Sequence, residues 1–221
     1  DIFPIGTTKV IYTFTDVAGN TASCSFNITV KSNALKLKTQ QRYTDASGNT
    51  ITQLQPNQQF YYELRYQNDG SENINRATLD VKMPDATTIV ANGAPDLSGA
   101  GDGSWQHPQP TSSYNSVTKS WRFEIGANNN NSTLMLGDPE RVIRIPLKVQ
   151  GDCEALFAPC QNFVYTELTA TYKGGPAGCP LAEMSHTASL TTTINTSDCN
   201  RQEMFCGTGQ VTFKAIGGFT T

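Results

Sequence analysis

Apolar side chains recur at every second position in short segments of this chain, and this spacing limits its possible folds more than any other feature. A period of two turns successive side chains to opposite faces of a strand, so each segment is predicted to be a β-strand with one face toward a core. No stretch keeps apolar spacing of three and four residues over three helical turns, so no long helix is predicted. The clearest segments are residues 9–14, 22–30, 60–66, 77–83, 121–125, 143–149, 164–172 and 188–194.

Turn-forming residues separate these segments and favour an all-β fold. Residues 68–70 (NDG) have the composition of a tight turn, and many short strands with turns between them predict a β-sandwich. Residues 92–120 and 127–132 are rich in Gly, Pro, Ser and Asn, so both are predicted to be surface loops. Pro146 cannot donate a backbone hydrogen bond, so the 143–149 strand is predicted to lie at a sheet edge or to contain a bulge.

The low content of charged residues argues against nucleic acid as a partner. Charged residues make up 16% of the 221 residues and the net charge is −3. No window gathers the Lys and Arg that phosphate binding requires, so nucleic acid is not a predicted partner. No apolar run approaches the roughly 20 residues of a membrane span. The chain opens at Asp1 without Met or a signal peptide, so we interpret it as a piece of a longer protein.

Six cysteines suggest disulfide chemistry: Cys24, Cys153, Cys160, Cys179, Cys199 and Cys206. The pairs 153–160 and 199–206 share one spacing, and no C-x-x-C pair or zinc-finger histidine accompanies them. Disulfides within these two pairs are therefore predicted, each stabilising the fold by about 2–3 kcal/mol through the unfolded state. Free thiols and metal ligation are the alternatives, and the partner of Cys179 is left open. Disulfides imply an oxidising, exported location.

The first 31 residues resemble the second half of the hyalin repeat, or HYR, domain. The resemblance lies in residues 3–8 (FPIGTT), 12–21 (YTFTDVAGNT) and 24–26 (CSF). It implies an immunoglobulin-like fold and an extracellular adhesion protein, with residues 1–31 as the C-terminal half of such a domain. In that family the last cysteine usually pairs with one in the first half, so Cys24 is implied to be unpaired here or to pair elsewhere.

Residues 33–196 resemble the conserved-repeat β-sandwich domain of bacterial surface proteins. The similar stretches are residues 60–70 (FYYELRYQNDG), 81–84 (VKMP) and 136–138 (LGD). This resemblance implies immunoglobulin-like sandwich modules in series, with residues 197–221 as a last strand or the start of another module. HYR units beside such modules are similar to the giant gliding adhesins of the type IX secretion route, SprB-type proteins among them. A bacterial cell-surface location, with neighbouring modules as partners, is implied.

No catalytic residue or cofactor is predicted, and the chain is expected not to be an enzyme. His107 and His186 lie outside any zinc-protease motif, and no nucleophile elbow or phosphate loop is present. A secreted hydrolase with a triad assembled from distant residues is the open alternative.

A structural calcium ion is a second alternative, because hard cations prefer several oxygen ligands. Asp16 and Asp45 belong to Asp-x-x-Gly-Asn turns, where the competing interpretation is that the carboxylates cap backbone N–H groups. The other candidate aspartates are Asp96, Asp102, Asp138 and Asp152.

Aromatic residues supply the alternative function. Trp105, His107 and Tyr114 fall within one predicted loop, and together they suggest a ligand loop for a carbohydrate-binding module that contacts surface polysaccharide. Trp121 alternates with Phe123 and is predicted to belong to the core. The leading hypothesis is a non-enzymatic spacer or adhesive module whose strand pairs resist force in shear.

Overall fold

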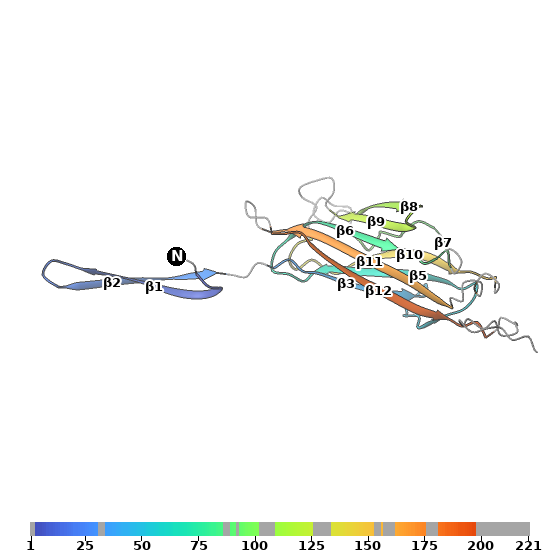
Figure 1. Cartoon of the computed structure of the whole chain (residues 1–221), viewed down its shortest axis with the longest axis horizontal. Helices are drawn as coiled ribbons and strands as arrows, with labels where there is room; N and C mark the ends of the chain where they lie inside the picture. Colours follow the sequence, from blue (N-terminus) through green and yellow to red (C-terminus); the bar gives the residue numbers. More distant parts are fainter. Residues whose placement is uncertain are drawn as a thin grey trace, which may run out of the picture.

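The computed structural model describes residues 3–30, 34–85, 89–91, 93–101, 109–125, 134–152, 156, 162–175 and 181–197. The strands are β1 (Gly6–Thr15), β2 (Thr21–Val30), β3 (Leu37–Thr44), β4 (Gln53–Leu54), β5 (Gln59–Asn68), β6 (Ile74–Lys82), β7 (Ile89–Ala91), β8 (Thr111–Asn115), β9 (Ser120–Ile125), β10 (Arg141–Val149), β11 (Phe163–Gly174) and β12 (Met184–Ile194). They form one hairpin and one two-layered sandwich (Figure 1). The prediction of an all-β fold is confirmed.

The hairpin of β1 and β2 is a separate two-stranded sheet, paired from Gly6 opposite Val30 to Thr15 opposite Thr21. Its alternation places Tyr12 and Phe26 on one face, where their rings stack with centroids 5.9 Å apart. No residue of either strand is buried, so the apolar face that the sequence predicts is present but uncovered.

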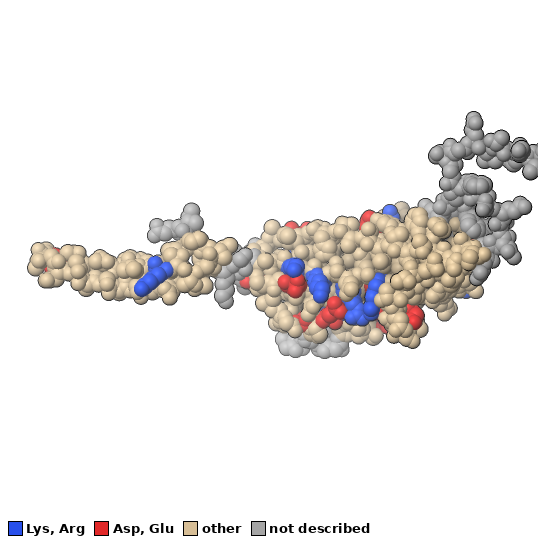
Figure 2. Space-filling view, turned by 90° about the horizontal axis from the view of Figure 1, so that it is seen from below, with Lys and Arg blue, Asp and Glu red and all other residues tan. Residues whose placement is uncertain are grey.

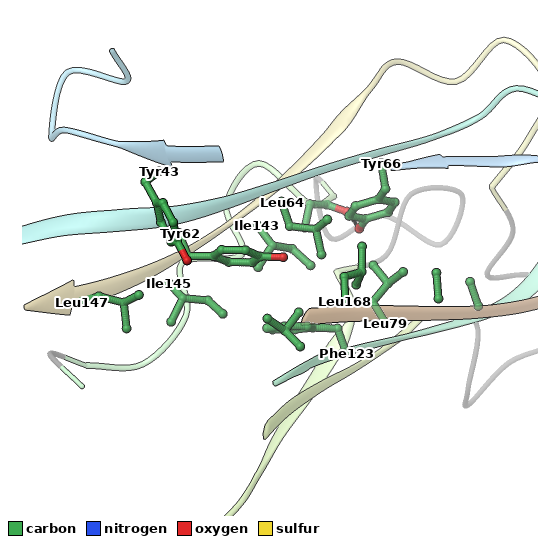
Figure 3. Packing of buried hydrophobic residues seen from close by; sticks show 14 of the residues in the cluster. Tyr43, Tyr62, Leu64, Tyr66, Leu79, Phe123, Ile143, Ile145, Leu147 and Leu168 are labelled. Atoms are coloured by element: carbon green, nitrogen blue, oxygen red, sulfur yellow. Dashed lines mark hydrogen bonds between the residues drawn. The ribbon is translucent and has the colours of Figure 1, made fainter. Parts of the chain in front are cut away.

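The sandwich consists of a four-stranded sheet, β3-β5-β10-β7, and a six-stranded sheet, β4-β12-β11-β6-β9-β8. Its pairs are antiparallel except β4 with β12, which run parallel. The inward residues of the two sheets meet in one core, which is unusually rich in tyrosine (Figure 3). The Tyr43 ring contacts Phe60 edge-on at 5.4 Å and Tyr62 at 6.2 Å between centroids, an arrangement that aromatic quadrupoles favour.

Two hydrogen bonds across the core define the relative direction of β3 and β12. Thr39 Oγ1 lies 2.9 Å from His186 Nε2, and Tyr43 Oη lies 3.0 Å from Thr166 Oγ1. Thr166 lies in β11, opposite Leu190 of β12. Residue 39 of β3 is therefore level with residue 186 of β12, and residue 43 is level with residue 190. The first and last strands of the sandwich therefore run in the same direction. The chain enters at one end and leaves at the other (Figure 1).

The structure corrects two predictions from the sequence. The expected loop at residues 92–120 contains a strand, β8, which pairs with β9 even though Thr, Ser and Asn dominate its sequence. Of the two alternatives predicted for the strand with Pro146, the sheet edge is wrong, because β10 lies between β5 and β7. Its ladder toward β7 is interrupted at Pro146, between the pair Leu147–Ala91 and the bridge Arg144–Asp96, so no N–H is missed there. The loop predicted at 127–132 lies outside the described residues.

Within the described ranges, no helix is long and apolar enough to cross a membrane.

Candidate functional site

One of the three predicted ligand-loop residues is placed by the structure. Tyr114 lies in β8, is 47% exposed, and has its ring centroid 5.1 Å from that of Trp121. Trp121 in turn stacks on Phe123 at 6.3 Å and packs against the core, as the alternation predicts. Trp105 and His107 lie outside the described residues, so their proximity to Tyr114 stays a prediction.

The predicted disulfide cysteines also lie outside the described residues: Cys153, Cys160, Cys179, Cys199 and Cys206. Their pairing stays a prediction. Cys24 is exposed in β2, opposite Tyr12, and its thiol is free. His186 is part of β12, where its Nε2 is hydrogen-bonded to the Thr39 hydroxyl and its ring contacts the Tyr172 ring edge-on.

The described aspartates that were calcium candidates are occupied by backbone and side-chain donors. Asp16 accepts hydrogen bonds from the amides of Ala18 and Asn20 and from the Asn20 side chain, and Asp45 accepts the same kind of bonds from Asn49. These contacts, the Asn20 side-chain bond first, lower the pKa of Asp16. The turn-capping interpretation is therefore confirmed for these two turns.

Two of the other candidate aspartates, Asp96 and Asp138, have similar hydrogen bonds. Asp96 caps the amide of Ser98, and Asp138 accepts bonds from Met135 N and Arg141 Nη2. Among the described residues no three His, Cys, Asp or Glu side chains are close enough to hold a metal ion. Asp102 lies outside the described part of the chain.

A polar cluster on the outer face of the four-stranded sheet brings together residues that the sequence does not single out. Strand register places Arg42, Glu63 and Arg144 in one row across β3, β5 and β10, and Arg65 lies two residues further along β5. The carboxylate of Glu63 is 2.6 Å from both Arg42 Nη2 and Arg65 Nε, and 3.1 Å from Arg144 Nε. We call these four residues the arginine cage.

The arginine cage holds neighbouring strands together through ion pairs and does not have the properties of an acid–base pair. Burial of Glu63 acts to raise its pKa, but the hydrogen bonds from Arg65 and Arg42 outweigh burial and hold the pKa below its ordinary range. The carboxylate is therefore ionised and acts as an acceptor only. Its side chain is 2% exposed, whereas the three arginines are 25–30% exposed. Figure 2 shows basic and acidic side chains side by side in a band along one side of the sandwich.

A second group of contacts joins the end of β12, the last strand of the sandwich, to β4, the short strand that follows β3. Thr193 and Ile194 of β12 pair in parallel with Gln53 and Leu54 of β4. The hydroxyl of Thr192 donates to the carbonyl of Thr52 at 2.8 Å, and the amide of Asn195 donates to that of Leu54 at 2.7 Å. We call residues 52–54 and 192–195 the terminal clamp. A two-residue strand has no periodicity, so the sequence carries no signal for it.

Comparison with known proteins finds one family model that matches a short part of the chain. Residues 1–30 match the model of the HYR domain. No curated protein matches the sequence. The HYR match indicates an extracellular or cell-surface setting for this part of the chain, in agreement with the resemblance found in the sequence.

Three solved structures are similar at low identity and with TM-scores under 0.5. BcpA, the major pilin subunit of Bacillus cereus, is 10% identical with a TM-score of 0.49, and the match covers 87% of this chain and 48% of BcpA. A cohesin module from a Clostridium perfringens family 33 glycoside hydrolase is 11% identical with a TM-score of 0.40, and the match covers 74% of this chain and 98% of the module. The C-terminal domain of Streptococcus agalactiae BspA is 13% identical with a TM-score of 0.39, and the match covers 85% of this chain and 59% of that domain.

Proposed function

We propose that this chain is a non-enzymatic, load-bearing module of a secreted bacterial surface protein, where it acts as a spacer or in attachment. The observation that carries the proposal is the shared direction of β3 and β12. Tension on the flanking chain pulls the start of β3 and the end of β12 away from each other. Each strand is then loaded along its own axis.

Load along a strand stresses all its ladder hydrogen bonds together, whereas load across a strand breaks them one at a time. β3 pairs with β5 from Leu37 to Thr44, and β12 pairs with β11 from Met184 to Thr193. The arginine cage ties the β3–β5 pair further to β10, and the terminal clamp holds β12 on its other edge. Both arrangements reinforce the strands through which force would enter and leave.

The wider setting follows from the sequence resemblances. The HYR match supports an extracellular adhesion protein, and the gliding adhesins of the type IX secretion route are the proposed context. The division into residues 1–31, 33–196 and 197–221 belongs to this proposal, as do neighbouring modules as partners. Short disulfide loops at the predicted cysteine pairs would limit extension near the C-terminal end.

Stretching the whole chain between its two termini in a single-molecule force instrument tests the load-bearing role. The hairpin has both ends on the same side, since Gly6 is opposite Val30, so it unzips first at low force. The sandwich is expected to rupture later in one high-force step that releases a contour length on the order of 500 Å. Gradual extension of the sandwich at low force, without a discrete rupture, would contradict the proposal.

A further inference from the structure

A groove at one end of the six-stranded sheet has features that the load-bearing role does not use. It has a volume of about 390 Å³ and lies on the solvent face, between the start of β11 and the turn that joins β8 to β9. The residues that line it and matter below are Lys82, Asp85, Thr118, Lys119, Phe163 and Tyr165. A second hollow of about 360 Å³ shares Thr118 with it and continues over Asp80 and Arg122.

Two aromatic side chains form an exposed platform in this groove. Phe163 and Tyr165 are two residues apart on β11, so both face solvent on the same side of the strand, about 7 Å apart along it. Each is 37% exposed, although large aromatic side chains are usually more deeply buried. The Tyr165 hydroxyl donates to Glu167 Oε2 at 2.8 Å, which fixes the ring in place and leaves its faces for a ligand.

The opposite wall is a turn held in an uncommon backbone conformation. Lys119 has φ of 51°, in the left-handed region that favours glycine. Asn115 Oδ1 accepts the amides of Val117 and Thr118, and the Lys119 carbonyl accepts the amide of Met83 at 2.9 Å, so the turn is anchored on both sides. Left-handed residues are a regular feature of short β-hairpin turns, so this conformation fixes the shape of the wall.

The polar groups at the rim are of mixed sign. The Lys119 ammonium is 3.9 Å from the Asp85 carboxylate, and Arg122 forms a two-bond pair with Asp80 at 2.7 and 3.0 Å. Such a rim does not attract a polyanion, because the positive charges are matched by carboxylates. It supplies both donors and acceptors, as sugar hydroxyls require.

We infer that this groove binds a neutral oligosaccharide, with pyranose rings against Phe163 and Tyr165 and hydroxyls bonded by Asp85, Thr118 and Lys119. The apolar C–H face of a sugar ring matches an aromatic surface, and the volume is within the range of small-molecule sites. Tyr114, the described member of the ligand loop that the sequence suggests, lines the adjoining second hollow. This inference rests on the proposed attachment role and names its ligand. If the groove binds no oligosaccharide, the proposed load-bearing role still stands.

Titration of the full chain by calorimetry with cellohexaose, chitohexaose, maltohexaose and laminarihexaose tests the inference. At least one hexaose is expected to bind with a dissociation constant in the micromolar to low millimolar range. Tyr165→Ala should weaken that binding at least about tenfold, whereas Tyr165→Phe, which keeps the ring, should stay within about twofold. Tyr12→Ala removes an even more exposed ring on the hairpin, 52% against 37% for Tyr165, and should leave hexaose binding unchanged.

Lys119→Gly separates folding from binding, because glycine relieves the positive φ while the amine is lost. This variant is expected to melt no lower than the parent protein and yet bind the hexaose less tightly. Absence of binding by all four hexaoses, or equal binding by Tyr165→Ala and the parent, would overturn the inference. Dextran sulfate binding that persists in Tyr165→Ala, with no hexaose bound, would place recognition on charge and would also overturn it.

Discussion

Glu63 is surrounded by arginines on the solvent-facing side of the four-stranded sheet, so the direction in which its replacement changes the free energy of unfolding can be predicted. Glu63→Gln keeps the shape but removes the negative charge that Arg42, Arg65 and Arg144 share. Arg65 keeps Glu140 as a partner at 2.8 Å, but Arg42 and Arg144 lose the carboxylate that they share, so the free energy of unfolding at pH 7 should fall by about 2–4 kcal/mol. Urea unfolding measures the change, and Glu183→Gln, at an exposed position, should stay within about 0.5 kcal/mol.

The same carboxylate makes the effect depend on pH. Its pKa in the folded protein lies below the unfolded value of about 4.3. The unfolded chain therefore binds more protons at this site, so the stabilisation is complete above pH ~4.5 and is lost as pH falls through the folded pKa. The stability difference between the parent and Glu63→Gln should shrink on acidification. A difference that stays constant down to pH 2 would show that charge at Glu63 is not its cause.

Gly174 is a residue that the fold cannot replace cheaply. It lies at the irregularity where β11 shifts register against β6, and a Cβ there would overlap the backbone oxygen of Asn73. Gly174→Ala should lower the free energy of unfolding by about 2 kcal/mol or more, because backbone and not a flexible side chain must move. Thermal unfolding measures it. Gly151→Ala, where the nearest atom would be 3.4 Å away in the Asn57 side chain, is the control expected to be nearly neutral.

At the scale of elements, the hairpin and the sandwich should differ in local stability. β1 and β2 have a full ladder but no buried residue, whereas β5 and β11 cross the core. A two-stranded hairpin is marginal in water, so its amides should exchange with deuterium orders of magnitude faster than those of β5 and β11. Hydrogen exchange by mass spectrometry reads both regions from one sample. Equal protection would mean that the apolar hairpin face is covered in solution.

The terminal clamp makes a separate prediction for β12. Thr192→Val preserves the shape of the side chain but leaves the Thr52 carbonyl without its donor at 2.8 Å. Because Thr192 is largely buried, the loss should cost about 1–2 kcal/mol in chemical unfolding. Thr187→Val, on the exposed face of the same strand, is the matched variant and should cost less. Equal losses in the two variants would assign no special role to the clamp.

Periodicity predicted the long strands whose inward residues are apolar, and it missed β3, whose inward residues are partly polar, as well as the short strands β4, β7 and β8. β5, β6 and β9 to β12 were predictable because their core faces alternate cleanly. β3 was not, because two of its inward positions are Thr39 and Gln41, which are satisfied by His186 and Tyr62 on other strands. The cage was equally hidden, since Arg42 and Arg144 lie 21 and 81 residues from Glu63 in sequence.

For the molecule as a whole, the proposed load-bearing function rests on where the chain enters and leaves the sandwich. The core connects the first and last strands of the sandwich, the terminal clamp holds β12 to β4, and the chain enters and leaves the sandwich at opposite ends (Figure 1). This geometry suits a unit in a series under tension better than a site for chemistry. The oligosaccharide groove lies on the outer face of one sheet, so a bound ligand and a loaded backbone need not interfere.

The direction of loading is the property to measure. One handle at Lys36 can be combined with a second at Ser197, which loads β3 and β12 in shear, or at Asp69, which peels β3 from β5 because Lys36 and Asp69 are neighbours 2.6 Å apart. The account predicts a rupture force several-fold higher for the 36–197 pair than for the 36–69 pair in the same protein. Equal forces, or a weaker response along 36–197, would contradict it.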